Sequence, residues 1–331
     1  MKRQTNLMYR IVEMENLYSA WLKAHKGKQG DPAVLDYEKN LDENLLRLKR
    51  DLMSGNAVTG NYHFFTISDP KVRKICAAPF SERIMHHALM NICSHRFEKH
   101  LIQNSCATRK GKGTKIALEK ATFYTKRFRW FVKLDIRKYF DTIDHIILKN
   151  KLNTMFKDKD VIELFSDIIN SYQADNLKGV SIGNLTSQYF ANHYLSQADH
   201  YATEQLKTHG YIRYMDDILF FGNDKQLLIS QCNAFISFVE KTLNLEFKQI
   251  VHDRTTGGVP FLGYRLYPYF VRLNRRSKKR FKTKMRAAYY NLEQRQWSES
   301  DFQQHVLPLL AFTEKADTLK LRKNVLQHIQ G

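Results

Sequence analysis

The sequence predicts an α+β fold in which strands carry acidic residues and helices occupy both ends of the chain. Apolar residues recur at helical spacing within residues 1–60. Beyond Val271 the composition becomes strongly basic, and we expect a helical segment there. Between these ends, Tyr211–Phe221 has two apolar, β-prone runs on either side of Asp216 and Asp217. This pattern predicts a strand, a tight turn that carries both carboxylates, and a second strand.

Composition limits the classes of function. The chain has 331 residues, 43% of them hydrophobic, which is enough for a sizeable core. Its formal net charge of +20 favours a polyanionic partner, and nucleic acid is the commonest one. No apolar run reaches the roughly 18 residues of a membrane span. The four cysteines are widely spaced, without a C-x-x-C pair, so we expect reduced thiols and a cytoplasmic protein.

A basic hairpin follows the N-terminal helices. Tyr62–Ile67 and Lys71–Ile75 are predicted to be strands joined by the turn at Asp69–Pro70. Three cations in the second strand either protect a sheet edge or contact phosphate. Ala78–Arg83 then opens a further helix.

An aspartate interrupts the apolar strand Phe131–Ile136. A carboxylate within such a strand is costly unless it is paired, ligates a metal or lies at an exposed end. Asp135 can therefore supply a third oxygen ligand beside Asp216 and Asp217, and carboxylate oxygens suit Mg²⁺. The alternative for Asp216 and Asp217 alone is an ordinary acidic hairpin turn.

Several further segments surround these acidic residues. Gly179–Gln188 is predicted to be a loop before the helix Tyr189–Leu206, and its two glycines would let a nucleotide approach the backbone. We expect an amphipathic helix over Leu228–Leu243, a short strand over Leu245–Lys248 and a hairpin over Gly257–Arg265. Arg272–Arg286 holds nine basic residues and no acidic one, which indicates a nucleic-acid clamp or a solvated face.

Three aspartates among basic loops fit two-metal phosphoryl transfer. In that chemistry one metal ion lowers the pKa of a primer 3′-hydroxyl, and the other holds the triphosphate and the leaving pyrophosphate. Positioning and charge stabilisation supply most of the rate enhancement.

Several motifs, in order, resemble those of reverse transcriptases. Tyr214–Asp217 resembles their Tyr-x-Asp-Asp box, Leu134–Asp141 their first metal-binding motif, and Leu262–Tyr264 their primer-grip hairpin. The resemblance spans roughly residues 60–270. It implies a right-hand polymerase fold, with the following parts: an N-terminal helical extension over residues 1–60, fingers over 61–130 (with part of 146–178), a palm over 131–265 and a basic helical thumb over 266–331.

Two motifs resemble the bacterial branch of that family. Ala77–Arg83 is similar to its fingers motif. Ile182–Gln188 resembles the Ser-Gln form typical of diversity-generating retroelements, where group II intron enzymes carry Gln-Gly. That resemblance implies a bacterial or phage enzyme that copies a template-repeat RNA into cDNA with errors opposite adenine. It also implies a small basic pentameric accessory protein as a partner.

The resemblance assigns site residues by motif. Asp135, Asp216 and Asp217 would ligate two Mg²⁺ ions with the Ile136 carbonyl, and Phe140 would be the steric gate under the sugar of the dNTP. Nucleotide contacts would come from Arg73, Arg83, Ile182, Gln188 and Lys248. The DNA or RNA primer would be held by Phe261, Leu262, Gly263 and Tyr264. The thumb would contact nucleic acid through Arg275, Arg276, Lys278, Lys279 and Arg280.

Other functions remain open from the sequence. The nearest alternative is the reverse transcriptase of a retron, a defence system or a reduced group II intron, which genomic neighbours would distinguish. A different class is a non-catalytic RNA-binding scaffold. Three intact aspartates argue against the scaffold, because a protein that only binds RNA gains nothing from carboxylates facing phosphates.

Overall fold

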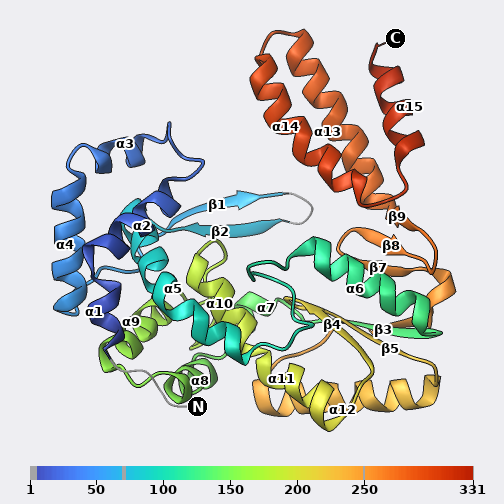
Figure 1. Cartoon of the computed structure of the whole chain (residues 1–331), viewed down its shortest axis with the longest axis horizontal. Helices are drawn as coiled ribbons and strands as arrows, with labels where there is room; N and C mark the ends of the chain where they lie inside the picture. The colour runs from blue at the N-terminus through green and yellow to red at the C-terminus, as the bar shows by residue number, and fades with distance from the viewer. Residues whose placement is uncertain (1–5, 69–71, 249, 331) are drawn as a thin grey trace. The chain divides into compact units, whose positions relative to one another are not determined.

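The structure is a computed structural model that describes residues 6–68, 72–248 and 250–330. The chain divides into two compact units (Figure 1). The first comprises residues 1–103, 136–201 and 235–248, and the second comprises residues 104–135, 202–234 and 249–331. The turn expected at Asp69–Pro70 lies outside the described residues. No helix in the described ranges is both long and apolar enough to cross a bilayer.

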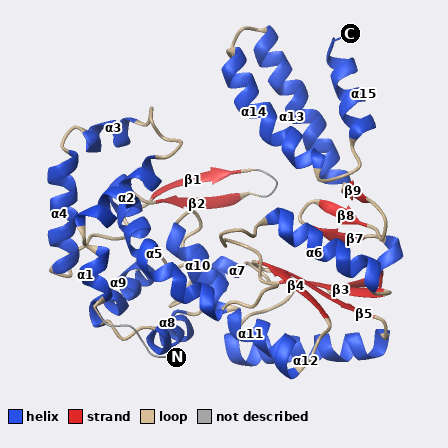
Figure 2. Cartoon of the chain, in the orientation of Figure 1, coloured by secondary structure: helices blue, strands red, loops and turns tan. Residues whose placement is uncertain are grey.

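The first unit is mainly helical (Figure 2). It begins with α1 (Leu7–Ile11), α2 (Met14–His25), α3 (Pro32–Glu38) and α4 (Leu41–Met53). Asp31 starts α3, because its side chain accepts the Ala33 N–H at 3.0 Å and Pro32 takes the first helical position. The strands β1 (His63–Ile67) and β2 (Arg73–Ala77) form the expected antiparallel hairpin.

Helix α5 (Phe80–His100) forms the centre of this unit and packs against α2 and α10. Its Phe97 lies in an aromatic cluster with Phe156, Phe165 and Phe190. The other helices of the unit are α7 (Tyr139–Thr142), α8 (His145–Met155), α9 (Lys159–Asn170), α10 (Leu185–Tyr194) and α11 (Ser196–His200).

The second unit contains a four-stranded antiparallel sheet with the order β4-β5-β3-β6. Its strands are β3 (Trp130–Asp135), β4 (Gly210–Tyr214), β5 (Asp217–Gly222) and β6 (Val251–Arg254). Residue 135 pairs with residue 217, and residue 130 pairs with both residue 222 and residue 254. Helix α6 (Thr114–Arg127) packs near this sheet, and α12 (Lys225–Leu243) follows β5.

A smaller sheet and three helices complete the second unit. The sheet consists of β7 (Val259–Phe261), β8 (Tyr264–Leu266) and β9 (Val271–Leu273), of which only β7 and β8 were expected. Its apolar side chains share a core with Phe131, Leu219 and Phe221 of the larger sheet. The helices are α13 (Arg275–Glu293), α14 (Glu299–Glu314) and α15 (Leu319–Gln330).

Two expected elements were placed wrongly. The predicted strand Leu245–Lys248 makes only an isolated antiparallel bridge, between Phe247 and Ile136, and the strand that joins the sheet is β6. The predicted helix Tyr189–Leu206 begins earlier, at Leu185, after the extended backbone of Asn184. It is also divided, because α10 ends at Tyr194 and α11 ends at His200, before a π-helical turn over Tyr201–Gln205. A mixture of helices with antiparallel sheets confirms the α+β class.

Gly210 offers a test of how tightly the four-stranded sheet packs. A Cβ there would lie 2.6 Å from the Phe221 Cβ and 3.0 Å from the Phe128 ring, although its φ is an ordinary one. We expect Gly210→Ala to lower the free energy of unfolding by about 1–3 kcal/mol. Chemical denaturation measures this difference.

Gly222→Ala is the matched control in the neighbouring strand. The nearest atom to its added Cβ is 3.4 Å away, which is close to ordinary van der Waals contact. Equal stability of the two variants would contradict the packing described for Gly210.

Candidate active site

The turn between β4 and β5 presents the paired aspartates. Tyr214 pairs with Asp217, so only Met215 and Asp216 lie between the strands. Met215 takes a left-handed backbone with φ of 54°. The prediction that both carboxylates lie on the turn was therefore wrong for Asp217, which is the first residue of β5. Met215 takes the first of the two turn positions, so only Asp216 of the two aspartates lies on the turn.

Sheet register brings the third aspartate to the same place. Asp135 ends β3 directly opposite Asp217, and side chains opposite each other have Cβ atoms about 5 Å apart. The charges of Asp135 and Asp216 both raise the pKa of Asp217. The second unit thus gathers all three predicted aspartates at one end of its sheet.

Asp217 lies in an environment that disfavours its charged form. Its pKa is raised to about 6, mainly by burial and further by the charges of Asp216 and Asp135, against the opposing effect of the Lys133 ammonium. Lys133 Nζ donates to Asp217 Oδ2 at 2.9 Å and lies 2.8 Å from Oδ1. Oδ1 nevertheless has no hydrogen bond of acceptable direction. A buried carboxylate in this state is poorly satisfied and attracts a cation.

Lys133 also connects Asp217 to the β7–β8 hairpin. The same ammonium donates to the Pro260 carbonyl at 3.2 Å. Lys133 and Asp135 project from the same face of β3, because side chains two residues apart share a face. Lys133 was not among the predicted site residues, because its contact with Asp217 depends on the register of β3 with β5.

Arg213 supports the turn from within the protein and was also missed. Its side chain is fully buried and donates to the Met215 carbonyl at 3.2 Å and to Ser105 Oγ at 3.0 Å. An arginine is rarely buried without several hydrogen bonds. A charged residue inside the apolar run before the aspartates was the signal that could have identified it.

The predicted primer-grip residues divide into two kinds. Phe261 and Tyr264 are buried in the core, and the Tyr264 hydroxyl donates to the Phe312 carbonyl at 2.7 Å. Leu262 and Gly263 form the turn, with φ of 48° and 90°, and are only half-buried. Of these four residues, only the two in the turn are partly exposed, while the two aromatic residues pack in the core.

The first unit joins three of the segments predicted to bind nucleotide. The Phe140 carbonyl accepts the Val180 N–H at 2.8 Å, and the Ile182 carbonyl accepts the Cys76 N–H of β2 at 2.8 Å. These bonds connect α7, the loop that begins at Gly179 and the β1–β2 hairpin. Gln188 was expected in the loop but lies on α10, because the helix begins at Leu185.

The remaining predicted residues are found on several elements. Arg73 is exposed at the start of β2, whereas the Arg83 Nε–H donates to the Ala78 carbonyl at 2.9 Å. Lys248 follows Phe247, which pairs with Ile136. The five predicted thumb cations lie on α13, exposed except for the half-buried Arg280: Arg275, Arg276, Lys278, Lys279 and Arg280.

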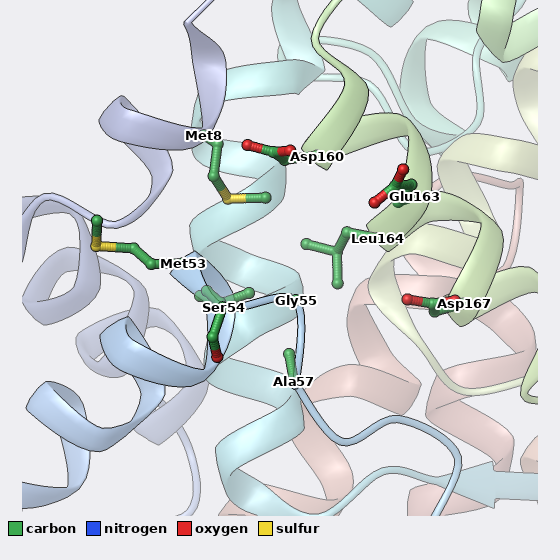
Figure 3. Close-up of a pocket in the computed structure, with 10 residues that line it drawn as sticks. Met8, Met53, Ser54, Gly55, Ala57, Asp160, Glu163, Leu164 and Asp167 are labelled. Carbon is green, nitrogen blue, oxygen red and sulfur yellow. The ribbon is translucent and has the colours of Figure 1, made fainter.

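A separate hollow in the first unit has the wrong charge for phosphate. It has a volume of about 170 Å³ among α1, α4 and α9 (Figure 3). Asp160, Glu163 and Asp167 of α9 line it, with no basic residue. The carboxylates would repel a nucleotide, so this hollow does not belong to the candidate site.

The aspartate cluster has the donor atoms that a hard cation needs. Within the described ranges, no three Asp, Glu, His or Cys side chains already stand at metal-ligand spacing. Asp217 instead meets the Lys133 ammonium, although its Oδ1 lacks a hydrogen bond. Three carboxylates at one sheet end, one of them unsatisfied, fit Mg²⁺ in ligand chemistry.

Comparisons with known proteins identify a family and several relatives that this chain is similar to. Residues 68–266 match the family model described as reverse transcriptase (RNA-dependent DNA polymerase). The group II intron-encoded protein LtrA of Lactococcus lactis subsp. cremoris is 25% identical over 199 residues, which cover 58% of this chain and 33% of LtrA. The COX1/OXI3 intron 1 protein of Saccharomyces cerevisiae is 22% identical over 331 residues, covering 79% of this chain and 39% of that protein. The chain spans less than two-fifths of either relative.

A solved structure supports the fold. Telomerase from Candida albicans superimposes with a TM-score of 0.51 at 14% sequence identity, over 81% of this chain and 54% of that one. At this identity the likeness shows the fold alone, and it confirms the predicted right-hand polymerase fold. Since the family match also includes Asp135, Asp216 and Asp217, the chain belongs to the reverse transcriptase (RNA-dependent DNA polymerase) family.

Proposed function

We propose that the protein is an RNA-directed DNA polymerase whose active site is the aspartate cluster of the second unit. The observation that carries the proposal is the pairing of Asp135 with Asp217 beside Asp216, within residues that match the reverse transcriptase family. The substrates would be template RNA, a DNA or RNA primer and dNTPs.

Asp135, Asp216 and Asp217 would hold two Mg²⁺ ions, with the Ile136 carbonyl as a further ligand. When bound, Mg²⁺ lowers the pKa of a hydroxyl and neutralises charge on a triphosphate. The chain's own residues orient the ligands for that role. Lys133 favours the charged form of Asp217 and donates to its Oδ2, and Arg213 fixes the turn through the Met215 carbonyl.

Nucleotide and nucleic acid would be bound by the residues that the motif resemblance assigns to these roles. Phe140 would act as the steric gate, supported by its backbone link to the 180–182 segment. Contacts to the dNTP would come from Arg73, Arg83, Ile182, Gln188 and Lys248. The Leu262–Gly263 turn would support the primer end. The segment that contains α13 would form the thumb, and the cations of α13 would contact the phosphates of the duplex.

Within the family, we propose a diversity-generating retroelement. Ser187–Gln188 carries this assignment through the motif resemblance described above. A pentameric basic accessory protein would then be a partner, and errors would concentrate opposite adenine. A loose base pocket around Arg73 and Ile182 would explain such errors. The alternative is a group II intron reverse transcriptase, which the similarity to the intron-encoded protein LtrA favours.

Asp216→Asn tests the polymerase assignment. The substitution removes a carboxylate ligand without changing side-chain size, so we expect primer extension on RNA to fall about a thousandfold or more. RNA affinity should stay within about threefold of the parent protein, because the carboxylate does not attract phosphate. Extension assays and filter binding measure the two quantities.

Asp36→Asn, on an exposed face of α3 in the first unit, is the control and should leave both quantities unchanged. Persistent extension by Asp216→Asn would show that the metal site is assigned wrongly. A parent protein that binds RNA but extends no primer would point to the scaffold instead.

Lys133→Met tests the role of the ammonium beside Asp217. Lys133 lowers the pKa of Asp217, so its removal should raise that pKa above about 6. A protonated carboxyl is a poor metal ligand. Extension should therefore fall about tenfold near pH 6.5 and recover toward pH 8.5. Carboxyl ¹³C NMR titration of the metal-free protein measures the pKa directly.

Lys241→Met is the matched control, since Lys241 is exposed in the last turn of α12. If the pKa of Asp217 were unchanged in Lys133→Met, the ion pair with Lys133 would not be what lowers that pKa.

The error spectrum tests the retroelement assignment. On a four-base RNA template, misincorporation should concentrate opposite adenine, and sequencing of the cDNA measures it. Arg73→Ala and Ile182→Val should change that bias, because both positions would shape the base pocket. Faithful copying, or a bias that neither substitution moves, would favour the intron, retron or defence-system alternatives.

A further inference from the structure

A second hollow, this one lined by basic residues, lies at the other end of the four-stranded sheet. Trp130 begins β3 and pairs with Gly222 and Arg254, whereas Asp135 ends the same strand. Five residues of strand separate the two positions by about 17 Å. The hollow has a volume of about 1000 Å³. Four segments of the second unit line it: residues 125–130, 223, 254–256 and 268–269.

The lining carries positive charge. Four basic residues line the hollow: Lys126, Arg127, Arg129 and Arg254. Its lining contains no carboxylate. All four side chains are exposed, and among the described residues none of them forms an ion pair. Such a lining favours a polyanion.

The two nearest acidic residues in the sequence are already engaged. Asp224 Oδ1 caps α12 by accepting the Gln226 and Leu227 N–H groups at 2.8 and 3.0 Å. Asp253 Oδ1 accepts the Arg254 N–H at 2.6 Å. Both carboxylates moderate the positive charge of the region without entering the lining of the hollow.

Two aromatic residues stand among these cations. The half-buried Trp130 ring has Lys225 Nζ 5.1 Å from its centroid and the Arg254 guanidinium 5.2 Å away. Tyr269 is 91% exposed. A tyrosine ring so fully exposed within a basic hollow offers a stacking surface for a base.

The Tyr269 ring stands on a well-defined turn. The Tyr267 N–H donates to the Phe270 carbonyl at 2.9 Å, and these two rings stack with centroids 4.4 Å apart. The Arg272 guanidinium lies 4.8 Å from the Phe270 centroid. Tyr269 therefore projects from a closed turn whose neighbours are already packed.

Hydrogen bonds preform the floor of the hollow. Asn223 Oδ1 accepts the Arg129 N–H at 3.1 Å, and the Thr255 hydroxyl donates to the Phe128 carbonyl at 2.7 Å. The Thr255 N–H donates to the Arg129 carbonyl at 2.9 Å. These bonds hold three of the lining segments together before any ligand arrives, so little ordering would accompany binding.

We propose that this hollow binds a single-stranded segment of nucleic acid. Phosphates would contact Lys126, Arg127 and Arg129, and one base would stack on Tyr269. Cations that follow a backbone beside an exposed aromatic ring are the usual arrangement for single strands. The site goes beyond the proposed polymerase activity, because it lies at the end of the sheet opposite the aspartates and would bind whether or not the protein extends primers.

The test uses a fluorescent decamer of uridine containing 4-thiouridine, with a deoxythymidine decamer beside it. An excess of primer–template duplex occupies the polymerase site. Tyr269→Ala should weaken decamer binding about tenfold, while Tyr269→Phe, which keeps the ring, should bind within about twofold of the parent protein. Photocrosslinks should map to residues 126–130 and 267–270.

Salt dependence tests the phosphate contacts separately. Arg127→Ala with Arg129→Ala should reduce the slope of log affinity against log salt by about 1.4, since each phosphate contact to a single strand contributes about 0.7. Lys157→Ala with Lys159→Ala removes the same charge from exposed positions in the first unit and should leave the slope unchanged. Equal melting temperatures of all the variants would show that they fold.

Unchanged affinity and slope in the Tyr269 and arginine variants would overturn the proposal. So would variant-dependent binding of a polyglutamate decapeptide without binding of either oligonucleotide, which would indicate an acidic protein partner. Preference for uridine or deoxythymidine identifies the strand as RNA or DNA. Primer extension at saturating duplex should be equal in all variants, so a failure of the polymerase proposal would be seen separately.

Discussion

The antiparallel pairing of β3 with β5 is the constraint on which the rest of the site depends. This register places Asp135 opposite Asp217, and a slip of one residue would turn Asp135 to the other face of the sheet. Two like charges opposite each other destabilise a sheet. Burial and the neighbouring carboxylates raise the pKa of Asp217 to about 6. The site is thus a strained concentration of negative charge held by the surrounding fold.

Apolar packing fixes that register, and two basic side chains bind the polar groups at its end. Phe131, Leu219 and Phe221 lie in one core with the β7–β8 hairpin. Lys133 occupies the position between this core and Asp135, where its ammonium reaches both Asp217 and Pro260. Arg213, buried beneath the turn, holds the Met215 carbonyl. The same sheet therefore contains an apolar core at its middle and the cluster of three carboxylates at its end.

Local sequence patterns predicted where the helices and strands lie better than which side of each one is buried. The Asp216–Asp217 hairpin, Asp135 on its strand and the β7–β8 hairpin could be read from alternation and turn residues. The role of Lys133 could not, because a lysine in an alternating strand usually faces solvent, and only the register brings it to Asp217. Phe261 and Tyr264 were expected to contact a primer, but short apolar runs do not reveal which side packs inward. Likewise, the basic hollow near Trp130 combines four segments that are far apart in the sequence.

The most direct measurement of the central claim is affinity cleavage with Fe²⁺ in place of Mg²⁺. Ascorbate and peroxide generate hydroxyl radicals at the bound ion, which cut the nearest backbone, and mass spectrometry locates the cuts. The account predicts cuts within residues 134–136 and 215–218, suppressed by excess Mg²⁺ and absent from Asp216→Asn. Cuts at other positions, or cuts at these positions that persist in Asp216→Asn, would contradict a metal site formed by the β3–β5 pairing.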